Sequence, residues 1–250
     1  YFQRRKQVRF LADKKESIIK AKHPIKMEKA SGNGLEQMTI EKLKKLPLGT
    51  SDFTALRLSD EIYVDKTQKV YDLASVRGKY FLARPRRFGK SLLISTFESL
   101  FKYGLRDFEG LAIEKQWKEE KTYNVVRLDF SEIKNFISLE SFSKKLTALL
   151  LRSFAPHGFD YVADPVEDIA DQLSSWLRIL PPNSLVVLID EYDAPLTACL
   201  NDGELFNAVR SVLSEFYAIL KSNDAALRFV FITGITKFNK TSIFSELNNL

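Results

Sequence analysis

The chain has 250 residues, of which 45% are hydrophobic, enough to build one large α/β domain or two small ones. Its single cysteine, Cys199, excludes an internal disulfide, and one cysteine with two histidines is too little for a zinc cluster. The sequence contains neither an apolar run of about 18 residues nor a secretion signal. We therefore expect a cytoplasmic protein that makes no membrane contact.

The positive charge of the chain is concentrated near its N-terminus. The formal net charge is +6, but residues 1–46 hold 13 Lys/Arg against 5 Asp/Glu, whereas the remaining 204 residues hold 25 against 27. A basic segment of this kind is compatible with a solvated, partly helical extension and with contact to the phosphates of DNA or RNA. We favour the solvated extension and keep nucleic-acid contact as the alternative.

The sequence suggests two parts of unequal size. Residues 1–3, Tyr-Phe-Gln, resemble the end of a cleavable tag, and "SGNG" at residues 31–34 predicts a flexible break. We therefore expect a basic N-terminal arm at residues 1–33 and one folded domain at residues 34–250. Because the sequence stops at Leu250 without a turn signal, we expect the natural domain to continue beyond it.

Strand-like and helix-like segments alternate along the folded domain. Short apolar runs predict strands, and apolar residues at helical spacing predict helices. In chain order the sequence predicts strand 79–84, a helix containing residues 93–101, strand 124–130, helices 139–153 and 166–180, strand 184–190, a helix containing residues 206–220, and strand 228–235. This alternation predicts an α/β fold with a parallel sheet and helices on both faces.

The segment "RPRRFGKSLLIST", Arg84 to Thr96, ends like a phosphate-binding P-loop but carries an arginine where the pattern has its first glycine. In such a loop, consecutive backbone N–H groups and a helix N-terminus bind phosphates, a lysine reaches the β and γ oxygens, and a hydroxyl binds magnesium. These roles point to a site formed by Arg86, Arg87, Phe88, Gly89, Lys90, Ser91 and Leu92, with Lys90 as the phosphate lysine and Ser91 as a metal ligand.

A second motif, "LVVLIDEYD" at residues 185–193, is an apolar run that ends in two acids. This pattern is typical of the acidic motif of P-loop ATPases, in which Asp190 would hold magnesium and Glu191 would activate the attacking water. The occurrence of both motifs in the right order, each at the end of a strand, indicates nucleotide binding. For Asp193 we expect a supporting or turn-capping role.

The last predicted strand leads into "ITGITKFNK", in which Thr233 or Thr236 could contact the γ-phosphate or the attacking water as a sensor. A purely structural role is an equal alternative for both. A GTPase would need an aspartate where Asn239 stands, so the sequence favours ATP. Arg86 and Arg87 could stabilise charge on the γ-phosphate, pair with Asp65 or Glu191, or simply be exposed.

These blocks resemble the AAA-ATPase-like family of bacteria and archaea, whose members often carry a C-terminal PD-(D/E)XK-type nuclease domain. The resemblance is collinear from about residue 46 to residue 250, through "LPLGTSDFTALR", "YVDKT", "RPRRFGKSL", "LIDEYDAPL" and "FITGITKFNKTSIFSELNNL". Within this family an arginine at the position of Arg84 is usual, so the resemblance implies a functional loop. It also implies a catalytic-glutamate AAA-like core, in which the Thr233 strand lies between the other two motif strands.

The resemblance guides three further expectations. The segment that includes Phe53 lies where related ATPases cover the adenine, so Phe53 is a candidate for base stacking, with core packing as the alternative. The nuclease half is not visible in this sequence, and the group Asp129, Glu132 and Lys134 is interpreted as a solvated strand edge. The sequence leaves open whether several copies of the chain associate.

We therefore predict a magnesium-dependent ATP-binding and hydrolysing domain that drives or gates an attached effector, such as a nuclease in a defence-type system. Glu191, Lys90 and Thr233 are its predicted catalytic residues. The alternative is a nucleotide-controlled switch or a nucleic-acid-binding module with negligible hydrolysis.

Overall fold

The fold is built around a sheet of four parallel strands, which the computed structural model describes within residues 44–164 and 166–235. Its strands are β1 (Gly78–Ala83), β2 (Asn124–Asp129), β3 (Leu185–Asp190) and β4 (Leu227–Gly234). Their order is β1-β4-β3-β2, with Leu82 opposite Thr233 and Ile189 opposite Ile232. The predicted α/β fold with a parallel sheet is therefore confirmed.

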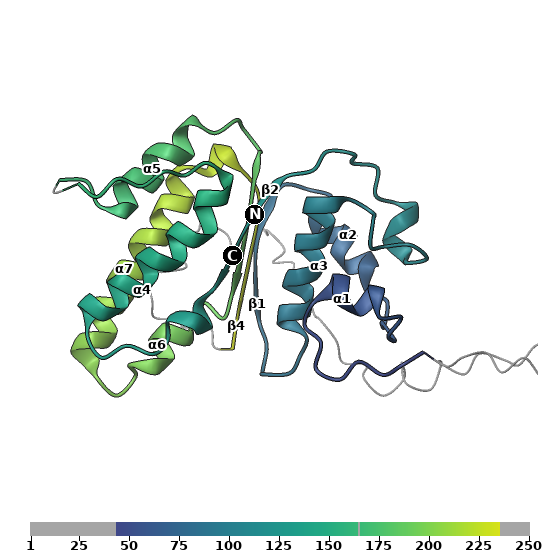
Figure 1. The fold of residues 1–250 in the computed structure, drawn as a ribbon, viewed down its shortest axis with the longest axis horizontal. Helices are drawn as coiled ribbons and strands as arrows, with labels where there is room; N and C mark the ends of the chain where they lie inside the picture. Colours follow the sequence, from purple (N-terminus) through teal and green to yellow (C-terminus); the bar gives the residue numbers. More distant parts are fainter. Residues whose placement is uncertain (1–43, 165, 236–250) are drawn as a thin grey trace, which may run out of the picture. The chain divides into compact units, whose positions relative to one another are not determined.

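Helices cover both faces of the sheet, as Figure 1 shows with the strands seen edge-on. The first face carries α1 (Phe53–Leu58), α2 (Thr67–Ala74) and α3 (Lys90–Tyr103). The second face carries α4 (Leu139–Phe154), α5 (Ile169–Ile179), α6 (Ala194–Ala198) and α7 (Gly203–Ser222). Short 3₁₀ turns lie at Ala112–Lys115, Phe130–Ile133, Ala155–His157 and Asp224–Ala226.

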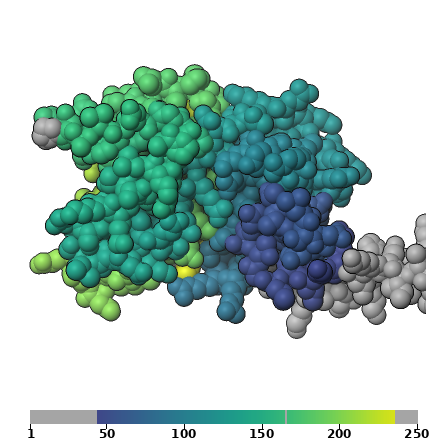
Figure 2. Space-filling view, viewed as in Figure 1, coloured from purple at the N-terminus to yellow at the C-terminus, as the bar shows by residue number. Residues whose placement is uncertain are grey.

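The two central strands are buried along their whole length, which explains their continuous apolar sequences. Their side chains alternate between two hydrophobic clusters, one on each face of the sheet. In β3, for example, Val187 faces the cluster of the α4 to α7 side and Leu188 faces the cluster of the α1 to α3 side. The space-filling view shows these two helical layers as a green and a blue half (Figure 2).

Local sequence signals set the helix ends. Ser138 forms a capping box with Ser141 at the start of α4, and the Asp202 carboxylate accepts a hydrogen bond from the Leu205 N–H at the start of α7. The predicted helix 166–180 is wrong at its first end, because Asp168 accepts hydrogen bonds from the N–H groups of Ala170 and Asp171 and so starts α5 at Ile169. The short helices α1, α2 and α6 were not predicted.

The described residues all belong to the second of two units, residues 1–42 and 43–250, into which the chain divides. The predicted boundary after residue 33 and the basic arm lie outside the described residues. None of the helices that the structure describes is both long and apolar enough to cross a membrane.

Candidate functional site

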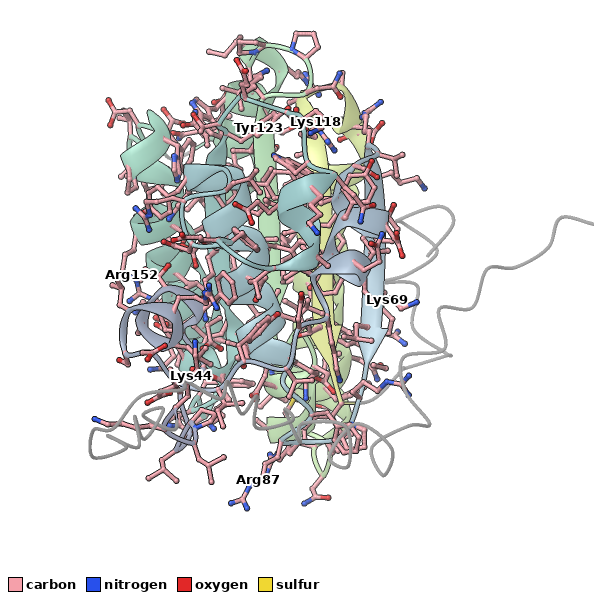
Figure 3. All side chains as sticks on the ribbon, turned by 90° about the vertical axis from the view of Figure 1, so that its right-hand side faces the viewer. Lys44, Lys69, Arg87, Lys118, Tyr123 and Arg152 are labelled. Atoms are coloured by element: carbon pink, nitrogen blue, oxygen red, sulfur yellow. The ribbon has the colours of Figure 1, made fainter. Side chains whose placement is uncertain are left out.

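The carboxyl ends of the four parallel strands meet at one edge of the sheet, which is where nucleotides bind in open α/β folds. Four segments leave this edge: the loop after β1, the 3₁₀ turn after β2, the acidic turn after β3 and the chain after β4. Strand β4, which carries Thr233, lies between β1 and β3, and this confirms the strand order implied by the resemblance. Arg87 marks this edge in Figure 3, opposite the end that carries Lys118 and Tyr123.

The phosphate-binding half of the P-loop sequence has the required backbone. Gly89 is the N-cap of α3, with φ 74°, and no side chain caps the helix there. The first N–H groups of this 14-residue helix are therefore available to an anion, together with the positive end of the helix dipole. A side chain at Gly89 would meet no atom within 4 Å, so it is the left-handed conformation that favours glycine here.

The Lys90 side chain lies against the backbone of the P-loop. Its side chain is buried, at 6% exposure, and its Nζ donates hydrogen bonds to the carbonyl oxygens of Arg84 (3.0 Å) and Pro85 (3.1 Å). The ammonium group is thus held by the backbone of the P-loop and not by an unrelated part of the core. Ser91 and Leu92 follow in the first turn of α3.

Arg84 replaces the first glycine of the pattern without backbone strain. Its N–H donates to the Gly234 carbonyl oxygen at 3.0 Å, so this residue continues the ladder between β1 and β4. The left-handed positions of the loop are instead Arg87, with φ 65°, and Gly89. The arginine at position 84 is therefore compatible with a P-loop conformation, because the backbone there is an extension of the strand.

Asp190 and Thr233 are in direct contact at the ends of β3 and β4. Both are buried, at 2% and 0% exposure. The Thr233 hydroxyl donates a hydrogen bond to Oδ1 of Asp190, which also accepts one from the Glu191 N–H at 3.1 Å. In the described part of the chain, Asp190 has no ion pair with a lysine or arginine.

Glu191 has an unusual backbone conformation for a residue with a side chain. Its φ is 49°, in the left-handed region, and its side chain is partly exposed at the strand end. Such strain concentrates at functional sites, where the surrounding structure holds it in place. The Glu191 N–H, which donates a hydrogen bond to Oδ1 of Asp190, also lies 3.4 Å from the Thr233 hydroxyl oxygen.

Asp193 supports the acidic turn instead of capping α6 with its side chain. It is 2% exposed, and its Oδ2 accepts a hydrogen bond from the Ile235 N–H at 3.0 Å. This contact connects the turn after β3 to the end of β4, in line with the supporting role expected from the sequence.

Arg86 and Arg87 are exposed, and neither forms an ion pair in residues 44–164 and 166–235. The carboxylate of Asp65 bonds instead with Thr67 and with the Ala112 N–H. The Arg87 side chain points away from the sheet (Figure 3). This exposure leaves two alternatives from the sequence, contact with a phosphate and plain exposure, and disfavours a pair with Asp65 or Glu191.

Phe53 packs in the core. Its ring is 0% exposed, with centroids 5.2 Å from Tyr63 and 4.8 Å from Phe108. Burial, together with the nearby Asp65 carboxylate, raises the pKa of Tyr63 to about 12, so this neighbour is neutral at physiological pH. The full burial of Phe53 favours core packing over base stacking.

Of the remaining predicted residues, Asp129 also lies at this edge, opposite Asp190 in the register of β2 and β3. Thr236 and Asn239 lie outside the described residues. Asp129 accepts a hydrogen bond from the Ser131 N–H, and Glu132, which pairs with Arg152, is exposed like Lys134, which agrees with the solvated strand edge expected from the sequence.

No group of three or more His, Cys, Asp or Glu side chains in the described ranges is arranged as a metal cage. Magnesium does not require one, because it usually takes one or two protein carboxylates and completes its shell with phosphates and water. The carboxylate of Asp190 and the hydroxyl of Ser91, in the first turn of α3, are oxygen donors of the kind that magnesium takes.

Comparison with known proteins agrees with this geometry. The sequence pattern of the family described as predicted AAA-ATPase matches residues 47–244. A protein of Azotobacter chroococcum mcd 1, described as an uncharacterized protein in the vnfD 5′ region, is 35% identical over 210 residues, or 83% of this chain and 40% of that protein. The chain thus spans less than half the length of this relative. By the extent of the family match, and by the strand order and P-loop described above, the chain belongs to the predicted AAA-ATPase family.

Proposed function

We propose that this chain binds ATP with magnesium at the carboxyl edge of its sheet, hydrolyses it, and uses the cycle to drive or gate an attached effector. Family membership supports ATP binding and hydrolysis in general. The observation that carries the proposal is the shared edge of the sheet. The loop that contacts Lys90 follows β1, and the Asp190 and Thr233 side chains are hydrogen bonded to each other at the ends of β3 and β4.

Phosphate binding is assigned to the loop and to the start of α3. The N–H groups around Gly89 and the positive helix end bind oxygens, and Lys90 neutralises part of the triphosphate charge. Arg86 and Arg87 lie in the same loop and are exposed, so either can approach a phosphate. The adenine is assigned to no described residue, because Phe53 is buried.

Metal binding is assigned to Ser91 and Asp190. A bound magnesium ion would neutralise charge that develops on the phosphate oxygens. Asp190 is suited to this role because it is ionisable, buried and without a cationic side chain of its own in the described residues. The Thr233 hydroxyl fixes the orientation of this carboxylate.

Hydrolysis is assigned to Glu191 as the general base and to Thr233 as the residue that senses the γ-phosphate or the water. Glu191 directly follows Asp190, so its carboxylate is carried by the same turn. A carboxylate within reach of a water can accept its proton as the water attacks phosphorus.

The effector is expected in the part of the protein that this chain does not span. The relative from Azotobacter is longer than the matched region, which leaves room for a further domain. A nuclease effector in a defence-type system is a proposal that follows from the sequence resemblance. Nucleic-acid contact through residues 1–33 is a proposal that follows from their basic charge. A cytoplasmic location and association of several copies are further proposals.

Binding is tested by the substitution Lys90→Ala. We expect the Kd for ATP to rise by about 100-fold or more in isothermal titration calorimetry, because the site loses its central cation. Lys69→Ala is the matched control, since Lys69 is an exposed lysine of α2 without a side-chain partner in the described residues. An unchanged Kd for Lys90→Ala would contradict the P-loop assignment.

Hydrolysis is tested by Glu191→Gln in a multiple-turnover assay of phosphate release with and without magnesium. We expect this variant to keep its ATP affinity and to lose turnover by about 100-fold or more, because an amide cannot accept the proton. Glu120→Gln, at an exposed glutamate in the loop before β2, should behave like the wild type. ATP binding without turnover in the wild type would instead indicate a nucleotide-controlled switch.

A further inference from the structure

The turn after β3 is connected to the end of β4 by three consecutive residues. The Glu191 N–H lies 3.4 Å from the Thr233 hydroxyl oxygen, and the Tyr192 N–H donates to the Thr233 carbonyl oxygen at 2.9 Å. The Asp193 carboxylate then accepts a hydrogen bond from the Ile235 N–H at 3.0 Å. The two segments are therefore joined at Thr233 and at Ile235, by main-chain and side-chain bonds.

The Tyr192 ring strengthens this connection by lying directly against Gly234. The ring is fully buried and meets Phe81 edge to face, with centroids 5.2 Å apart. A Cβ atom at Gly234 would lie 2.5 Å from two ring carbons of Tyr192 and 2.9 Å from Oδ1 of Asp193. Gly234 does not have a positive φ, so glycine is needed here for close approach and not for backbone conformation.

We infer that Tyr192, Asp193 and Gly234 form a clamp, hereafter the 192–234 clamp, which holds Glu191 and Thr233 in one fixed relative position. This inference rests on the proposed roles of Glu191 as base and Thr233 as sensor. The clamp residues are positioning residues, because they act through Glu191 and Thr233.

The strained backbone of Glu191 supplies the physical reason for a clamp. A left-handed conformation is unfavourable at a residue with a side chain, so the turn relaxes unless other contacts hold it. A base that shifts by about 1 Å can lose about 100-fold in rate. A fixed turn therefore contributes to turnover, whereas phosphate affinity depends on the loop after β1.

Asp193 is the best probe of the clamp. Gly234 is less suitable as a probe, because its carbonyl oxygen also accepts a hydrogen bond from the Arg84 N–H and so connects the clamp to the P-loop. Asp193→Ala removes the acceptor of the Ile235 N–H, whereas Asp193→Asn keeps an oxygen at the same place. The pair of variants separates positioning through a hydrogen bond from proton transfer by a carboxylate.

We expect Asp193→Ala to lower kcat by about tenfold or more while the Kd for ATP stays within about twofold, and Asp193→Asn to keep kcat within about threefold of the wild type. Asp160→Ala, at an exposed aspartate, is the control. The inference is overturned if Asp193→Ala turns over like the wild type, or if Asp193→Asn is as inactive as Glu191→Gln. Should Asp193→Ala fail to fold, Gly234→Ala carries the same expected loss of kcat through its contact with Tyr192.

Hydrogen exchange tests the clamp without reference to ATP. In Asp193→Ala we expect faster amide exchange in two segments at once, residues 191–194 and residues 232–235, because each protects the other. Faster exchange in residues 191–194 alone would overturn the clamp. A wild type that fails to hydrolyse ATP would contradict the proposed function, and the exchange result would still decide the clamp.

Discussion

Two buried aspartates differ in how their charge is compensated. Asp107 and Asp190 are 9% and 2% exposed. Asp107 accepts hydrogen bonds from the hydroxyls of Thr54 and Ser99, each at 2.7 Å, and forms an ion pair with Arg106 at 2.9 Å. Asp190 is bonded to a hydroxyl and an N–H group, and within the described ranges it has no cationic partner.

This difference separates a carboxylate that stabilises the fold from one that is available for chemistry. Asp107 lies in the loop after α3, and its hydrogen bonds connect this loop with Thr54 of α1 and Ser99 of α3. The adjacent Arg106 neutralises its charge. Asp190 is instead followed by a second carboxylate, Glu191, whose backbone is strained. A buried carboxylate without a cation is costly, unless a bound cation completes the site.

The largest expected effect is that of Asp190→Asn on turnover. We expect magnesium-dependent phosphate release to fall by about 100-fold, because an amide is a poorer ligand for a hard cation. Thermal unfolding should show no loss of stability beyond about 0.5 kcal/mol, since a buried charge without an ion pair is removed. A variant with wild-type turnover, or one that is strongly destabilised, would break the comparison.

Asp107→Asn should show the reverse pattern. We expect the free energy of unfolding to fall by about 2 kcal/mol, because the ionised group loses its favourable partners, while kcat and the Kd for ATP stay unchanged. Urea unfolding measures the first quantity and the phosphate-release assay the second. Reduced turnover at unchanged stability would contradict the structural role of Asp107.

The pH dependence of stability sharpens the role of Asp107. Burial opposes its ionisation, but hydrogen bonds from Arg106, Ser99 and Thr54 outweigh burial and lower its pKa from 3.8 to about 2. Because the folded pKa is the lower one, this contribution is complete above pH 3.8 and disappears as the pH falls towards 2. The difference in unfolding free energy between the wild type and Asp107→Asn should therefore shrink over this range.

The smallest expected effect is at Tyr217, a buried polar group with neither a hydrogen bond nor an ion pair among the described residues. Burial and then Tyr192 and Asp193 raise the pKa of Tyr217 well above its usual range, so its hydroxyl stays neutral. Tyr217→Phe should change the free energy of unfolding by no more than about 1 kcal/mol, and in the stabilising direction. A large destabilisation would reveal a partner for this hydroxyl.

Much of the fold was predictable because its signals are local. The continuous apolar runs of β3 and β4 follow from their burial between two helical layers, and the Gly89-Lys90-Ser91 sequence marks the start of α3. The family resemblance added the position of β4 between β1 and β3. The start of α5 was missed because Val166 continues the apolar pattern, although Asp168 is the residue that caps the helix.

The finer features of the site depend on contacts between distant segments, so the sequence alone did not predict them. Nothing in the local sequence distinguishes Gly234, whose lack of a side chain matters only because Tyr192 lies against it. Likewise, the left-handed conformations of Arg87 and Glu191 follow from how two loops leave the sheet. Phe53 was a candidate for base stacking because related ATPases cover the adenine with this segment, and its contacts with Tyr63 and Phe108 cannot be read from its neighbours in sequence.

The hydrogen bond between the Arg84 N–H and the Gly234 carbonyl oxygen has a consequence for how phosphate-binding loops are recognised. A sequence search that requires glycine at both ends of the loop would reject this chain. Within the loop, however, the left-handed backbone occurs at Arg87 and Gly89 and not at the first position, Arg84. In this chain the first glycine of the usual motif is thus replaced at a position where the preceding strand runs one residue further. Searches for distant relatives would gain sensitivity by requiring the Gly-Lys-Ser end of the loop and the acidic strand end, and by leaving the first position open.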